Sequence, residues 1–229
     1  MNSHVDVKPL SSRMIKLTPL AIGEFGFVWI ALALLVLLSM WLAPDTLRVG
    51  ALMAMAPFAS FLALVAVGQM LVIRQRGLDM SAGSMMTIAG LVLAILANRT
   101  GMILLPVIAT AAITALLGTV SGLLVARVNI SPIVATLAVE ALLVGGVRAI
   151  SGGTAMTLPK GFQDLTHTHI LGLPSSLVFA LVSIGFVAVL VNKTLTGRRF
   201  VAVGSSPRAA AASGLRILRY QVGAYAAAG

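Results

Sequence analysis

Hydrophobic and polar positions in this chain alternate over whole segments rather than over single residues. Six long apolar runs are separated by shorter polar segments, and each run approaches the ~20 residues that a helix needs to cross ~30 Å of hydrocarbon. The runs cover residues 27–43, 49–73, 80–98, 102–126, 130–147 and 171–191. A seventh apolar stretch begins at Tyr220 and reaches the last residue, Gly229. The pattern therefore predicts six complete spans, the start of a seventh over 220–229, and a chain truncated at its C-terminus.

The uninterrupted apolar runs favour helices over strands. Strands of a membrane β-barrel alternate between lipid-facing and lumen-facing residues, and a run such as ALALLVLL does not alternate. The first run is too long for a secretory signal and has no cleavage site, so we expect it to be retained behind a cytoplasmic leader over residues 1–22. With 59% hydrophobic and 10% charged residues and a mean hydropathy of +1.05, the composition is that of an integral membrane protein. We predict an all-α polytopic transmembrane helix bundle over residues 23–229.

The net charge of +10 is explained by topology. If the N-terminus is cytoplasmic, twelve of the sixteen Lys and Arg residues fall on the cytoplasmic side, as the positive-inside rule requires. The four that fall on or near the outer side are Arg48, Arg99, Arg148 and Lys160. Nucleic-acid binding is not expected, because the cytoplasmic segments offer only Phe200 and Tyr220 for base stacking.

Two connecting segments are long. A periplasmic loop is predicted over 148–170 and a cytoplasmic loop over 192–219, and the Gly and Pro residues in both predict backbone that is irregular rather than helical throughout. His167 and His169 in the outer segment lack a third ligand at a standard spacing, and the chain has no cysteine. We therefore predict a solvated outer loop and no metal site.

Asp79 follows the second run in the stretch GLDMSAGS, and a carboxylate near hydrocarbon needs a partner, a proton or water. Three interpretations are open. In the first, the stretch is a short cytoplasmic turn, with Gly77 as a helix C-cap and Asp79 or Ser81 as the next N-cap. In the second, it is the break in a discontinuous span that lines a cavity. In the third, Asp79 forms an ion pair with Arg74 or Arg76.

Four further positions in the runs carry polar or small residues. Glu140 lies inside the fifth run, where an acid needs a partner or a cavity, and both a structural role and a pathway role stay open. Gln69 in the second run is able to reach either another helix or a solute. Gly118 and Gly122 form a G-x-x-x-G pair, which predicts close packing of the fourth run against a neighbouring helix.

Three segments carry a family resemblance. They are LVIRQRGLDMSAGSMMTIAG around Asp79, GLLVARVNISPIVATLAVEALLVGGVRAISGGTAM from Gly122 to Met156, and TLTGRRFVAVGSSPRAAAASGLRILRY from Thr194 to Tyr220. In this order they resemble the membrane permease subunits of bacterial ATP-binding-cassette importers of the ribose, xylose and autoinducer-2 type. The similarity extends over roughly residues 50–229, and three ordered matches are more specific than one motif.

The resemblance implies two groups of functional residues. Residues near the translocation pathway are expected to be Gln69, Gly77, Asp79, Ser81, Gly83 and Glu140. The loop over 192–219 resembles the family's coupling segment, which docks on a cytoplasmic ATPase, and its candidate residues are Gly197, Arg198, Arg199, Pro207, Arg208, Ala209, Ala210, Ser213 and Gly214. Independently of the resemblance, Ser206 and Pro207 are good helix starters, and a short helix over 208–213 ended by Gly214 is compatible with that role. A solvated basic linker between two spans is the alternative.

The resemblance also implies the surroundings of the chain. Its partners would be a cytoplasmic ATP-binding subunit, a second permease subunit in a homo- or heterodimer, a periplasmic or lipid-anchored solute-binding protein facing the outer loop, and membrane lipid. The chain would lie in the bacterial inner membrane and bind no cofactor, with ATP on the partner. The transported solute would be small and polar, with a monosaccharide favoured.

Other functions make different demands on the sequence. An intramembrane serine protease or metalloprotease needs a histidine within a span, and no apolar run contains one. An ion-coupled secondary transporter shares broken helices and intramembrane acids but needs no ATPase, and the chain has no G-x-x-x-x-G-K-[ST] motif of its own. We keep the secondary transporter and a nonfunctional permease fragment as alternatives.

Overall fold

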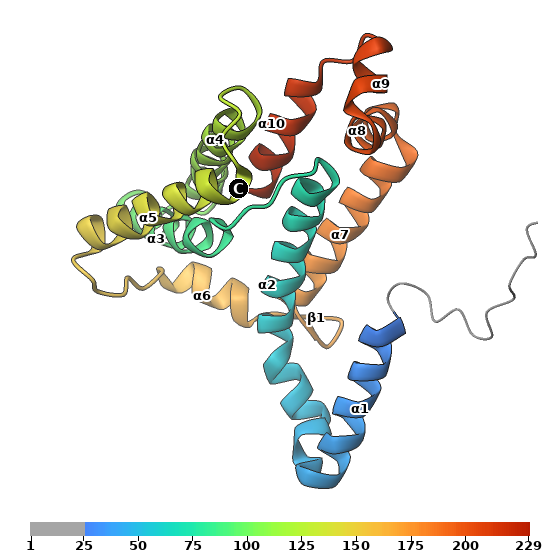
Figure 1. The fold of residues 1–229 in the computed structure, drawn as a ribbon. Coiled ribbons are helices and arrows are strands. Elements are labelled where there is room, and N and C mark those ends of the chain that lie inside the picture. Colours follow the sequence, from blue (N-terminus) through green and yellow to red (C-terminus); the bar gives the residue numbers. More distant parts are fainter. Residues whose placement is uncertain (1–25) are drawn as a thin grey trace, which may run out of the picture. The chain divides into compact units, whose positions relative to one another are not determined.

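The structure is a computed structural model that describes residues 26–229. The leader predicted over 1–22 lies outside the described residues. The described chain consists of helices and one small hairpin, which confirms the all-α polytopic prediction (Figure 1). In the part that the structure describes, it divides into two compact units, residues 26–51 and residues 52–229.

The first unit contains α1 (Gly26–Leu42), the 3₁₀ helix η1 (Pro44–Leu47) and the beginning of α2. The α-helix ends before Pro44, as expected, since proline disfavours helical backbone at the residue that precedes it. In the turn that follows, Thr46 donates a hydrogen bond to the Ala43 carbonyl at 2.7 Å, and Asp45 pairs with Arg48 at 3.0 Å. At 17 residues, α1 is apolar but shorter than the five helices that are long enough to span a membrane.

Those five helices correspond to the second to sixth predicted runs. They are α2 (Val49–Arg74), α3 (Ala82–Thr100), α4 (Leu104–Ala126), α5 (Pro132–Ser151) and α7 (Ser175–Lys193). The largest differences from the predicted bounds have local causes. The helix α5 continues to Ser151 because Gly152 supplies a left-handed cap with φ +62°, and α7 begins only after Pro174. Many large apolar side chains on these helices face outward, including Phe58 at 75% exposure, as expected for a surface that contacts lipid.

The long connecting segments are more ordered than expected. The outer one contains α6 (Lys160–His167) and an antiparallel hairpin of β1 (His169–Ile170) and β2 (Leu173–Pro174). In the inner segment 192–219, α8 (Leu195–Ser205) and α9 (Pro207–Ala212) form more helix than expected, although the segment is not helical throughout, because it is interrupted at Ser206 and after Ala212. Thr194 and Ser206 start these helices by accepting hydrogen bonds from the amides of Gly197 and Ala209. The last helix, α10 (Ile217–Ala228), covers the predicted partial span.

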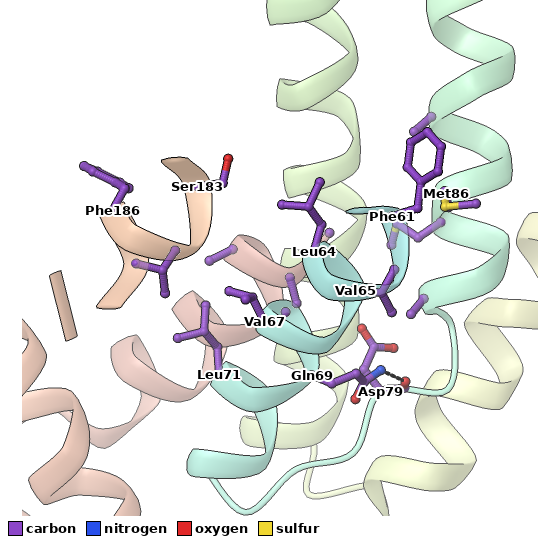
Figure 2. A pocket seen from close by; sticks show the side chains of 18 of the residues that line it. Phe61, Leu64, Val65, Val67, Gln69, Leu71, Asp79, Met86, Ser183 and Phe186 are labelled. Carbon is purple, nitrogen blue, oxygen red and sulfur yellow. Dashed lines mark hydrogen bonds between the residues drawn. The ribbon is translucent and has the colours of Figure 1, made fainter. Parts of the chain in front are cut away.

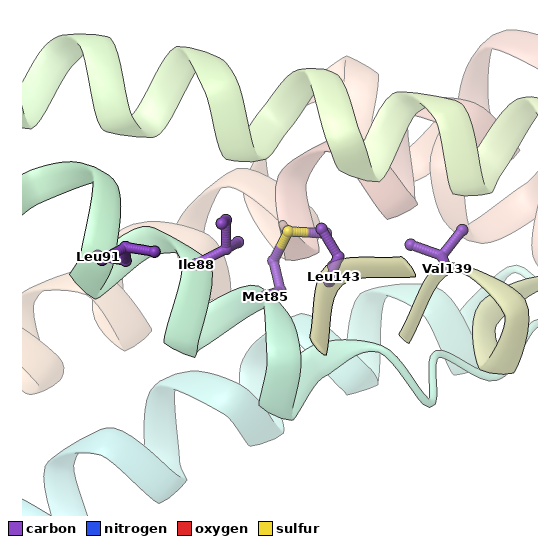
Figure 3. Close-up of a cluster of buried hydrophobic side chains, with 5 residues drawn as sticks. All are labelled: Met85, Ile88, Leu91, Val139 and Leu143. Atoms are coloured by element: carbon purple, nitrogen blue, oxygen red, sulfur yellow. The ribbon is translucent and has the colours of Figure 1, made fainter. Parts of the chain in front are cut away.

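An apolar cluster joins α3 and α5. Met85, Ile88 and Leu91 of α3 pack with Val139 and Leu143 of α5 (Figure 3). The α3 residues recur at intervals of three and those of α5 at an interval of four, so each helix presents one face to the other. This packing holds the start of α3, and therefore Asp79 just before it, against α5.

Small residues bring α4 and α10 into close contact. A Cβ at Gly118 would lie 2.3 Å from the Tyr225 carbonyl oxygen, and a Cβ at Gly122 would lie 2.9 Å from the Cα of Val222. Glycine is therefore required at both positions, and the predicted role of the G-x-x-x-G pair is confirmed. Buried Ser121 and Thr114 complete this face of α4.

Candidate functional site

The connection between α2 and α3 lies at the centre of the candidate site, and we call Gln75–Ser81 the junction segment. It begins with a Schellman motif, in which the amides of Arg76 and Gly77 donate to the carbonyls of Ile73 and Val72 at 2.8 and 3.1 Å. The left-handed residue of this motif is Arg76, with φ +62°. The prediction that Gly77 caps the helix was therefore wrong by one residue.

Gly77 is needed for a different reason. A Cβ at this position would lie 2.4 Å from the Tyr225 hydroxyl and 3.0 Å from a Val72 methyl group. The same hydroxyl donates a hydrogen bond to the Leu78 carbonyl at 3.3 Å. Tyr225 is 1% exposed, so α10 holds the junction segment through a buried polar contact.

This contact predicts a coupled pair of substitutions. Gly77→Ala is expected to lower the free energy of unfolding by about 2 kcal/mol, because the added methyl group overlaps the Tyr225 hydroxyl. In a Tyr225→Phe background the same substitution is expected to cost about 1 kcal/mol less, since one overlap is gone. Thermal or denaturant unfolding of the four proteins in detergent measures the difference. Equal costs in both backgrounds would contradict the contact.

Asp79 acts as a local cap. Its Oδ1 accepts hydrogen bonds from the Ser81 amide at 2.9 Å and the Ser81 hydroxyl at 2.6 Å, an Asx-turn that leads into α3. Asp79 is 5% exposed and Ser81 is fully buried. The turn interpretation is therefore confirmed only in part: Ser81 occupies the N-cap position of α3 without a side-chain capping bond, and Asp79 forms the turn just before it, whereas the Gly77 cap was wrong. The ion-pair interpretation was wrong, because Asp79 pairs with neither Arg74 nor Arg76 within the described residues.

Two distant side chains fix the backbone around Asp79. The Gln69 amide of α2 donates to the Asp79 carbonyl, and the Met80 amide donates to the Thr136 hydroxyl of α5 at 3.0 Å. Thr136 is fully buried and also donates to the Pro132 carbonyl at 2.8 Å. The break between α2 and α3 is therefore held by hydrogen bonds from both sides.

A cavity of about 590 Å³ opens next to Asp79, between α2, α3, α7 and α10. Its walls are mostly apolar, with Phe61, Leu64, Met86 and Phe186 among them (Figure 2). The polar side chains in the lining are Gln69, Asp79 and Ser183, and the dashed line in Figure 2 marks the bond between the first two. An apolar pocket with a few fixed polar groups is the usual form of a small-molecule site.

The structure gathers some of the predicted pathway residues and separates others. Gln69 and Asp79 line the cavity, whereas Ser81 donates a hydrogen bond to Asp79 but does not line the cavity itself. Gly83 is exposed and a Cβ there would meet open space. Glu140 lies on α5 outside the cavity lining, half-buried, with Oε2 buried and without a hydrogen-bond partner within the described chain.

The residues that sequence reasoning missed are Thr136 and Tyr225. They lie 56 and 147 positions from the residues that they contact in the junction segment. The last part of α10, GAYAAA, is made of small residues except for Tyr225, and this contrast was the one local signal for it. No local pattern identifies Thr136 as the partner of Met80.

The predicted coupling residues divide into exposed and buried sets. On α9 and just after it, Arg208, Ala209 and Ser213 are exposed, while Ala210 is buried. Gly214 ends this helix with φ +78°, as expected from the sequence. The helix thus presents one free face and is anchored by the other.

The start of the segment is similarly divided. Arg198 and Arg199 are exposed on α8, and Pro207 is partly exposed at the start of α9. Gly197 is buried, and a Cβ there would lie 2.2 Å from the carbonyl oxygens of Leu190 and Val191. Glycine at this position permits the sharp turn between α7 and α8.

Comparison with known proteins shows similarity to a family of transport proteins. The sequence profile of the family described as branched-chain amino acid transport system / permease component matches residues 51–229. The ribose import permease protein RbsC of Haemophilus influenzae is 27% identical over 208 residues, covering 88% of this chain and 64% of that protein. The galactose/methyl galactoside import permease protein MglC of Escherichia coli is 28% identical over 215 residues, covering 84% and 63%.

A third relative is the autoinducer 2 import system permease protein LsrD of Escherichia coli, 28% identical over 173 residues, covering 72% of this chain and 52% of that protein. The chain thus spans less than two thirds of the length of these relatives. No solved structure gives a significant match.

Proposed function

Because the chain belongs to the family of permease components of branched-chain amino acid transport systems, we propose that it is the membrane-spanning subunit of an ATP-driven importer. It is a multi-pass protein of the bacterial inner membrane. In this proposal the chain forms a translocation pathway, and a separate cytoplasmic subunit binds and hydrolyses ATP. The chain is then a transport component rather than an enzyme and needs no cofactor of its own.

One observation carries the proposal. The exposed face of α9, where an ATPase would dock, belongs to a segment that is hydrogen-bonded to the junction segment beside the cavity. A docking surface and a solute cavity joined by direct contacts are what conversion of ATPase motion into transport requires. An ion-coupled carrier has no use for such a surface.

For the solute, we propose a small polar molecule and favour a monosaccharide. The relatives are named for import of ribose, galactose and autoinducer 2, all of which are small and polar. The cavity is large enough for such a molecule, and its aromatic walls with Gln69 and Asp79 suit a ring that carries hydroxyl groups. A second permease subunit, homo- or heterodimeric, and a periplasmic or lipid-anchored solute-binding protein complete the proposed importer.

Reconstitution tests the energy source. The permease is purified with candidate ATP-binding and solute-binding subunits and placed in liposomes, and uptake of radiolabelled ribose and galactose is measured. Uptake that requires ATP and persists when ionophores collapse ion gradients supports the proposal. Uptake driven by an ion gradient without ATP would replace it with the secondary-transporter alternative.

A charge reversal tests the docking face. Arg208→Glu is expected to reduce co-purification of the ATP-binding subunit about tenfold, because it reverses the charge at the exposed start of α9. Lys160→Glu on α6 makes the same charge change on an exposed residue of the predicted outer side and serves as the matched control. Equal recovery of the ATPase with both variants would argue against docking at α9.

A further inference from the structure

Two consecutive side chains at the end of α2 reach the C-terminal part of α8. The Arg76 guanidinium donates through Nε to the Gly204 carbonyl at 2.9 Å and through a second nitrogen to the Ser205 carbonyl. The Gln75 amide donates to the Phe200 carbonyl at 2.8 Å. The last carbonyls of a helix have no partner within it and carry partial negative charge, so Arg76 supplies both the missing donors and a complementary charge.

The two helix ends also touch through their backbones. A Cβ at Gly204 would lie 1.8 Å from the Arg74 carbonyl oxygen, and the neighbouring Val203 is fully buried. Any side chain at Gly204 would therefore force α8 away from α2. The ends of α2 and α8 therefore pack backbone against backbone, and the contact does not depend on flexible side chains alone.

The backbone of Arg76 is unfavourable for an arginine. Its φ of +62° is at the position of the Schellman motif that glycine usually occupies. A non-glycine residue in the left-handed region costs free energy and persists only where the surrounding structure holds it. Glycine would satisfy the backbone here, but only a long donor side chain reaches both carbonyls of α8.

The residues after Arg76 connect the same segment to the cavity. Leu78 accepts a hydrogen bond from Tyr225 of α10, and Met80 donates one to Thr136 of α5. Between them, Asp79 lines the cavity. Within five positions, the chain therefore passes from the α8 contact to the polar wall of the candidate solute site.

We propose that Arg76 is a positioning residue that locks α8 and α9 to the junction segment, so that a displacement of α9 moves the backbone at Asp79. Its purpose rests on the proposed function, in which α9 docks on the ATPase. The Arg76 guanidinium donates two hydrogen bonds to the end of α8, and the two acceptors fix its orientation. Both a translation and a rotation of α8 therefore displace the backbone at Arg76. A simple helix cap would stabilise α8 without coupling it to Asp79.

Hydrogen exchange distinguishes coupling from capping in the chain alone. The full chain is placed in nanodiscs of phosphatidylethanolamine and phosphatidylglycerol, and amide exchange is followed by mass spectrometry. Gly214→Val loosens α9, because a β-branched residue is strained at φ +78° while its Cβ meets open space. The exchange rate of residues 77–82 is then compared in the Arg76 and Arg76→Gly backgrounds.

With Arg76 present, Gly214→Val is expected to raise exchange in residues 77–82 about fivefold, through a coupled local opening. In the Arg76→Gly background, exchange there is already raised and Gly214→Val adds nothing further. Arg76→Lys, which keeps the charge and a donor, is expected to restore part of the response to Gly214→Val. Arg127→Gly removes an arginine from the C-terminal end of α4 and is expected to leave that response intact.

Two results would overturn the proposal: an equal response of residues 77–82 to Gly214→Val in both backgrounds, or no response in either. Arg76→Asn serves as a second variant should Arg76→Gly not fold, since asparagine tolerates positive φ. The measurement uses no ATPase and no solute. A negative exchange result therefore overturns the role of Arg76 without touching the proposed transport function. Conversely, a failure of ATP-dependent uptake would leave the coupling between α9 and residues 77–82 intact.

Discussion

Replacing Asp79 with asparagine is expected to lower solute uptake at least about tenfold while the protein still inserts and folds. Asparagine keeps an Oδ1 that accepts the bonds from the Ser81 amide and hydroxyl, so the Asx-turn before α3 is kept. What is lost is the negative charge beside Gln69 in the cavity wall. A solute hydroxyl that donates to this carboxylate loses a charge-assisted hydrogen bond.

The measurement is uptake of radiolabelled ribose and galactose by the proposed importer, with expression and thermal unfolding checked for each variant. Asp79→Ala removes the two Asx-turn hydrogen bonds as well as the charge and is expected to lower stability by about 1 kcal/mol in addition. Asp45→Asn makes the same chemical change at an exposed carboxylate of η1 and is the matched control. Normal uptake with Asp79→Asn, together with reduced stability of Asp79→Ala, would leave Asp79 with a purely structural role.

Gly118→Leu is expected to lower the free energy of unfolding by about 3 kcal/mol or more, a large effect for a single substitution. The added Cβ would lie 2.3 Å from the carbonyl oxygen of Tyr225, so α10 has to separate from α4. Because Tyr225 also holds Leu78, the shift is expected to reach the junction segment. Gly90→Leu on α3 adds the same side chain where a Cβ meets open space.

Denaturant or thermal unfolding of both variants in detergent provides the comparison. A similar loss of stability in Gly118→Leu and Gly90→Leu would show that the α4–α10 contact contributes little. Adding Tyr225→Ala to Gly118→Leu is not expected to restore stability, because the added Cβ overlaps the backbone of Tyr225 and not its side chain.

For α9, the sequence predicted the helix but not which of its faces is exposed. The structure buries Ala210 and leaves the other alanines of α9 exposed. The sequence predicted a short helix over 208–213, and the structure has α9 over Pro207–Ala212. Helix starters and glycine caps act within a few residues, so local patterns reveal them. Which side of the helix is free depends on the elements that pack against it, and these are distant along the chain.

The sequence by itself determined the approximate bounds of five membrane-spanning helices, because a backbone in hydrocarbon must satisfy its hydrogen bonds within each segment. The complete span predicted over 27–43 corresponds to α1, which at 17 residues is shorter than those five helices. The sequence also determined the close-packing role of Gly118 and Gly122, since small residues at this spacing form one helix face. Only the tertiary structure decided that Arg76, and not Gly77, takes the left-handed position, and that Asp79 lines a cavity. Those outcomes depend on Gly204, Tyr225 and Thr136, which folding brings from distant positions and which no local pattern links to the junction segment.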